Sequence, residues 1–224
     1  VDPTRDAPSV IIGDSGSSAD QRGAAVELQS VQSQIASTAS LAASAASGTS
    51  GSTDADGAAN SALDSIAQAV SDGMGGDDTD GNDEGDGNDE GGGDEDQGGT
   101  VDLSDQNTVS GIVSNTVQNV ADANGTTVDA ETVTSVSDSV SQIAANVNAN
   151  MRDAVTNNSD PAGAVAEIVR NQGVAQNDAA EQVGQGASEG NLDDATANFT
   201  GDRLNDAADR SEATVSDDIS GQLP

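Results

Sequence analysis

The chain has 224 residues, and 40 Asp and Glu residues against 6 Arg residues give it a formal net charge of −34. Because it contains no Lys, His or Cys, the usual general bases and nucleophiles of enzymes are missing, and we do not expect an enzyme. The acidity also argues against binding to nucleic acid through a basic patch, and no apolar run approaches the ~20 residues that span a bilayer.

Residues 1–19 are predicted to form an extended arm. Pro3 and Pro8 disfavour a helix there, and glycine and serine dominate the stretch before Asp20. Within the arm, Val10, Ile11 and Ile12 form a short apolar cluster that can dock on a neighbouring surface.

The segment 20–74 is predicted to form a helical hairpin. Its first helix covers about 20–47, with apolar residues alternately three and four positions apart, which is the spacing of a heptad seam. The large members of this seam, which we expect to meet a partner helix in an assembly, are Leu28, Val31 and Ile35. After a linker rich in Gly and Ser, a second helix carries an apolar stripe made of Ala59, Leu63, Ile66 and Val70.

An acidic tract follows at 75–99, where eleven residues are Asp or Glu, ten are Gly and none is apolar. The hexapeptide Asp-Gly-Asn-Asp-Glu-Gly occurs there twice in tandem, at 80–85 and 86–91. A segment of this composition has nothing to bury in a core. It is therefore predicted to be either a solvated linker or an ion-binding loop.

Calcium is the one metal that the acidic tract suits, because calcium loops supply oxygen ligands at alternate positions. Asp80, Asn82 and Glu84 match the first, third and fifth positions of such a loop, but Gly91 stands where the last position requires Glu. The sequence does not decide between a solvated linker and a calcium-binding loop. If calcium binds, the predicted ligands are Asp78, Asp80, Asn82, Glu84, Asp86, Asn88 and Glu90.

A second hairpin is predicted over 100–158. Its first helix ends at the Asn124–Gly125 pair, and Thr127 is expected to cap the next helix. That helix, which runs to about Asn157, carries the longest seam in the chain. We expect this seam too to serve assembly, through Val133, Val136, Val140, Ile143 and Val147.

The remaining residues, 159–224, are predicted to form short helices. Asp160 can cap a helix that has Pro161 at its first position. Glycines are expected to end or interrupt these helices, at Gly173, Gly184, Gly186 and Gly190. The predicted fold class is therefore all-α, with elongated amphipathic helices, coiled-coil-like hairpins and little or no β-structure.

The composition resembles that of structural proteins from haloarchaea and haloarchaeal viruses. The shared features are the absence of Lys, the excess of Asp over Glu, and small apolar side chains at the seams. The resemblance implies that the chain works in concentrated salt. Its charge is tolerable there, since the Debye length falls to about 3 Å at 1 M.

Together these features favour a structural protein of a large assembly, such as a minor capsid, vertex, fibre or tail-connector protein of a haloarchaeal virion. Its expected partners are further copies of itself or other structural proteins, and its expected location is the virion or an extracellular high-salt medium. The haloarchaeal cytoplasm is the alternative location. Two other functions stay open: a calcium-dependent surface or binding module of a haloarchaeal cell, and a disordered acidic spacer.

Overall fold

The computed structural model describes residues 8–13, 16–74 and 101–210, which form helices and connecting turns without a β-strand. The predicted all-α fold class is therefore confirmed. The acidic tract, with all seven predicted calcium ligands, lies outside the described residues, as does the segment 211–224.

The N-terminal part differs from the extended arm that we predicted. Residues Pro8–Gly13 form a short helix, α1. Pro8 occupies its first position, where the missing N–H removes no hydrogen bond from the helix. The helix packs on α2, and Ile12 lies partly buried against the core. This part of the apolar cluster therefore docks on the chain's own bundle.

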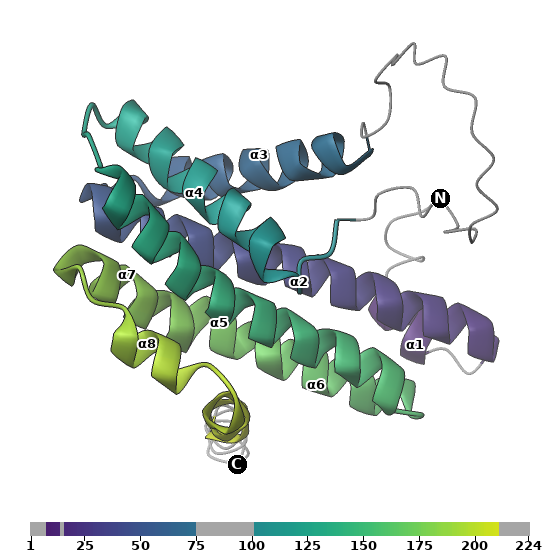
Figure 1. The fold of residues 1–224 in the computed structure, drawn as a ribbon. Helices are drawn as coiled ribbons and strands as arrows, with labels where there is room; N and C mark the ends of the chain where they lie inside the picture. Colours follow the sequence, from purple (N-terminus) through teal and green to yellow (C-terminus); the bar gives the residue numbers. More distant parts are fainter. Residues whose placement is uncertain (1–7, 14–15, 75–100, 211–224) are drawn as a thin grey trace, which may run out of the picture.

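The central element is α2 (Ala19–Ser50), a helix of 32 residues. It begins with a capping box, in which Ser18 N donates to Gln21 Oε1 at 2.9 Å and Gln21 N donates to Ser18 Oγ at 3.2 Å. It ends at Gly51, whose φ of 67° is the left-handed conformation that glycine adopts readily. Figure 1 shows α3 and α4 on one side of α2, and α6 and α7 on the other.

Both predicted hairpins are pairs of helices in contact. The first pairs α2 with α3 (Ala55–Met74), and the second pairs α4 (Gln106–Ala123) with α5 (Ala130–Asn157). The hairpins are not separate bodies, however, because α2 also packs against α4 and α5 (Figure 1). The cap of α5 is Asp129, whose side chain accepts from Thr132 N at 2.9 Å, and the Thr127 cap that we predicted is wrong.

The C-terminal third is more continuous than predicted. The helix α6 (Pro161–Val174) leads through a π-helical turn, η1 (Ala175–Ala179), directly into α7 (Ala180–Glu189). Gly173, Gly184 and Gly186 therefore do not end helices, and only Gly190, with φ 72°, closes α7. Buried residues on both sides of the π turn hold the run against the core: Val174, Ala175, Ala179 and Val183.

Glycine has a packing role where α7 meets α2. A Cβ atom on Gly48 of α2 would overlap the carbonyl oxygen of Gly184. The two backbones thus approach more closely than a side chain on Gly48 allows, which explains why this position of α2 is a glycine.

The chain then forms α8 (Asp193–Asn198) and a further helical stretch at 202–210. Between them, Phe199 is buried and Gly201 turns the chain with φ 58°. A turn thus separates two helical segments within the region where we predicted short helices.

Small aliphatic side chains build the core. Val and Ala dominate it, with a few larger residues such as Leu41, Ile143 and Met151. The buried polar residues are Ser, Thr, Asn and Gln, and no Asp, Glu or Arg is buried in the described part of the chain. All the charge that the structure places thus lies at or near the surface.

Candidate assembly surface

The structure separates the eight residues predicted to form assembly seams into two groups. The five on α5 lie in the core and are at most 7% exposed: Val133, Val136, Val140, Ile143 and Val147. They pack against other helices of the same chain. A partner chain therefore cannot reach them in the folded bundle.

The three residues on α2 lie at the surface. Leu28 is 47% exposed and Val31 is 51% exposed, whereas Ile35 is partly buried. With Ala24, which is also exposed, they continue one line along the helix at spacings of four, three and four. We call these four residues the α2 stripe. Farther along the helix, Ala42 and Ala46 continue that line and are buried in the bundle.

The predicted contact of these residues with a partner helix stays a prediction, and over its N-terminal half α2 packs into its own bundle through another face. The buried face carries small polar residues instead, Ser30, Ser33 and Ser37. Ser30 Oγ donates to the carbonyl oxygen of Met151 at 3.3 Å, and Ser33 Oγ donates to Gln172 Oε1 at 2.9 Å. These bonds reach α5 and α6, so they fix the rotation of α2 that leaves the stripe outside.

On α3 too, the buried face differs from the apolar stripe that the sequence predicted. Its buried residues are Ala58, Ala62, Ser65 and Ile66, whereas Leu63 is 46% exposed. In both helices most of the buried side chains are small and allow close helix contact, whereas some of the large aliphatic side chains face solvent.

Charge is absent around most of the α2 stripe. From Leu28 to Thr53 the sequence contains no Asp, Glu or Arg, although the whole chain has 40 acidic residues. The charged residues of α2 are Asp20, Arg22 and Glu27, and all three precede the large members of the stripe. Leu28, Val31 and Ile35 therefore lie on an uncharged stretch of α2 that begins directly after Glu27.

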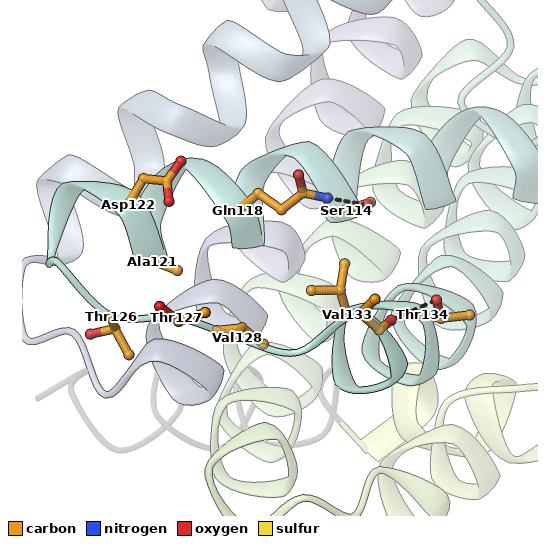
Figure 2. A pocket seen from close by; sticks show the side chains of 10 residues that line it. Ser114, Gln118, Ala121, Asp122, Thr126, Thr127, Val128, Val133 and Thr134 are labelled. Carbon is orange, nitrogen blue, oxygen red and sulfur yellow. Dashed lines mark hydrogen bonds between the residues drawn. The ribbon is translucent and has the colours of Figure 1, made fainter.

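A cavity of about 400 Å³ lies beside the connection between α4 and α5 (Figure 2). Its lining combines hydroxyl groups, the amide of Gln118 and the carboxylate of Asp122, with Val128 and Val133 as apolar floor. Gln118 is already engaged, since its Nε2 donates to Ser114 Oγ at 3.1 Å. The lining holds no cationic group.

Asp102 is held in place just before α4. It pairs with Arg152 of α5, with 2.7 Å between Oδ2 and Nη1, and accepts a hydrogen bond of 2.8 Å from Ser104 N. Partial burial acts to raise the pKa of Asp102, but the hydrogen bonds from Ser104 and Arg152 outweigh it and leave the pKa below its ordinary value. The pair therefore fastens the start of the second hairpin to α5.

At the start of α5, the pKa of Asp129 is also lowered. The main cause is the hydrogen bond that the carboxylate accepts from Thr132 N, followed by that from the Thr132 hydroxyl. A capping carboxylate of this kind is stabilised by the helix N-terminus. Asp129 is thus a structural group of the helix.

The described residues do not form a metal site. In the ranges 8–13, 16–74 and 101–210, no three Asp or Glu side chains are grouped closely enough to hold a metal ion. The calcium prediction concerns the acidic tract alone. Within the same ranges, no helix has the length and apolar character needed to cross a membrane.

Asn148 is a structural residue that sequence reasoning missed. It is fully buried in α5, and its Nδ2 donates to Thr38 Oγ1 at 2.9 Å and to the carbonyl oxygen of Leu103 at 2.7 Å. Its side chain therefore joins α2, α5 and the segment before α4. A polar residue directly after Val147 on the buried face is the only sequence signal for this role.

Comparisons with known proteins identify no relative of this chain: no protein-family model, curated protein or solved structure matches it.

Proposed function

We propose that this protein is a non-enzymatic structural component of a large assembly that works in concentrated salt, such as a haloarchaeal virion. The observation that carries the proposal is the α2 stripe. A folded, strongly acidic chain exposes large aliphatic side chains on one uncharged helix face, which is the kind of surface that a protein partner covers.

The distribution of charge supports the salt requirement. All acidic side chains in the described residues lie outside the buried core, which is built mainly of Val and Ala. At low salt the repulsion among these surface charges opposes the compact state. At about 1 M salt the Debye length of about 3 Å removes most of that repulsion, so a core of small side chains suffices.

The test of the salt requirement is far-UV circular dichroism of the full chain as potassium chloride is raised from millimolar to molar. We expect a cooperative rise in helix content. A matched variant without residues 77–96 loses eleven carboxylates but none of the described helices, so its transition should occur at lower salt. A spectrum that stays that of a coil in molar salt would contradict the proposal and favour the acidic spacer.

The test of assembly is light scattering coupled to size exclusion in molar salt, over a range of protein concentrations. The expected result is a mass that exceeds that of one chain and rises with concentration. A monomer at every concentration would count against a structural role.

A calcium-dependent surface or binding module is the second candidate function, and the tandem hexapeptide in the acidic tract favours it. Calorimetric titration with calcium in molar potassium chloride separates the two functions. Saturable binding that disappears in the variant without residues 77–96 would support the calcium module.

A further inference from the structure

We propose that the α2 stripe is the contact between two copies of this chain, which pair their α2 helices antiparallel about a twofold axis. The inference rests on the assembly role proposed above, because it names the partner and the surface used.

Charge selects this face over the other exposed apolar side chains. Val169 is as exposed as Val31, at 51% each, but Glu167 and Arg170 are its neighbours on α6. Leu63 of α3 precedes Asp64 and, unlike Leu28, has no second exposed large aliphatic residue beside it among the described residues of its helix. Two chains of net charge −34 repel each other wherever acidic faces meet. The stripe, which has no charged residue from Leu28 onward, is the apolar face where two copies approach at the lowest electrostatic cost.

The uncovered length of α2 fits a second copy. The stripe is exposed from Ala24 to Val31 and partly buried at Ile35, and beyond that point Thr38, Ala39, Ala42 and Ala46 are buried in the bundle. Figure 1 shows α3 and α4 lying over the C-terminal half of α2 and leaving its N-terminal half beyond them. The stripe runs from Ala24 to Ile35, so its middle falls between Leu28 and Val31. An antiparallel copy centred there overlaps the whole stripe.

Side-chain sizes favour the antiparallel direction. About this centre, Ala24 lies opposite Ile35 of the partner subunit, and Leu28 lies opposite Val31 of the partner subunit. Each layer then combines a smaller and a larger side chain, as interdigitated helix pairs do. A parallel pair would instead place two Ala24 residues in one layer and two Ile35 residues in another, leaving the first underfilled.

The size of the contact predicts that association depends on salt. One helix pair of this length is at the low end of specific interfaces, which bury about 1,200 Å² or more in total. Such a contact cannot overcome long-range repulsion between two acidic chains at low salt. It becomes effective once the Debye length is only a few ångströms, at about 1 M salt.

The first experiment measures mass by light scattering in molar potassium chloride for the full chain, for Val31→Asp and for Val169→Asp. The two substitutions are matched, since both valines are 51% exposed. We expect Val31→Asp to weaken association by about a hundredfold or more, because it buries two unpaired charges per dimer, and Val169→Asp to leave it unchanged. Circular dichroism confirms that both variants stay folded.

The second experiment determines the relative direction of the two α2 helices by disulfide cross-linking. The chain has no natural cysteine, so each introduced cysteine is the only one in its chain. Chains carrying Leu28→Cys and chains carrying Val31→Cys are oxidised separately and as a mixture. The antiparallel pair predicts that the mixed disulfide forms fastest, because disulfides need Cα atoms within about 7 Å. Leu63→Cys provides the control position.

Three outcomes would overturn the inference. If Val31→Asp assembles as the unmodified chain does, another surface carries the assembly and the proposed function still stands. If the full chain is monomeric and associates only after residues 211–224 are removed, the chain's own C-terminal segment covers the stripe. If the full chain is monomeric in molar salt with or without that segment, the inference and the proposed assembly function fail together.

Discussion

Asn148 on α5 and Thr38 on α2 are joined by a buried hydrogen bond of 2.9 Å, from Nδ2 to Oγ1. Both residues are fully buried. The second bond of the same amide group, to the carbonyl oxygen of Leu103, ties the segment before α4 to this point. One side chain therefore fixes how the two hairpins and the chain between them fit together.

Replacing Asn148 with Ala is expected to destabilise the bundle by about 2–4 kcal/mol. The substitution leaves a hydroxyl and a carbonyl group buried without this partner, and each such group costs about 1–3 kcal/mol. Thermal unfolding in molar salt measures the effect. Asn146→Ala is the control on the same helix, because Asn146 Nδ2 makes only a local bond to the carbonyl oxygen of Gln142, at 2.7 Å. Equal losses for the two variants would contradict the role given to Asn148.

Glycine substitutions should report how closely α2 and α7 approach. Gly48→Ala places a methyl group against the backbone of Gly184, so we expect a loss of about 1–3 kcal/mol from overpacking. Gly111→Ala in α4 meets no atom within 4 Å and should instead stabilise by about 0.5–1 kcal/mol, because alanine favours the helix. Opposite signs in unfolding experiments are the expected result. A gain for both substitutions would show that the two helices separate easily.

The sequence identified the buried face of α5, because the large aliphatic residues from Val133 to Val147 occupy a single face, but it assigned that face to assembly and the structure places it in the chain's own core. The face that α2 buries in the bundle could not be identified in the same way, because small apolar residues occur all around that helix. A central helix is contacted from several sides, so the spacing of its largest residues does not identify the buried face. In α2 that spacing marked Leu28 and Val31, which the structure places outside.

Two further features depend on contacts that sequence spacing does not contain. Asn148 meets Thr38, which is 110 positions away in the chain. The π turn at Ala175–Ala179 lies beside Gly173, whose glycine predicted an end to the helix; the buried Val174 and Val183 keep it packed instead. The calcium ligands in the acidic tract stay a prediction, since they lie outside the described residues.

The Asp102–Arg152 pair should contribute little to stability in molar salt. The side chains are 44% and 54% exposed, and exposed pairs contribute about 0.2–1 kcal/mol before screening. We expect a double-mutant cycle of Asp102→Asn and Arg152→Gln to give a coupling that shrinks as salt rises. A coupling that is large and independent of salt would show that the pair is shielded from solvent.

Acid should partly replace salt as the agent that folds this chain. At low salt, lowering the pH toward the ordinary carboxylate pKa of about 4 neutralises surface acids and relieves their repulsion, so helix content should rise. The gain has a limit, because the pKa values of Asp102 and Asp129 are lowered below 3.8 in the folded state. Groups with a lowered folded pKa stabilise the fold above their unfolded pKa and lose that contribution as the pH falls through the folded value.

The two effects predict different pH profiles at the two salt concentrations. At low salt, stability should pass through a maximum near pH 4 and fall again in stronger acid. In molar salt the repulsion is already screened, so the rise should vanish and only the acid loss should remain. Circular dichroism with thermal unfolding at each pH makes the comparison. A rise of similar size at both salt concentrations would show that charge repulsion is not what opposes folding.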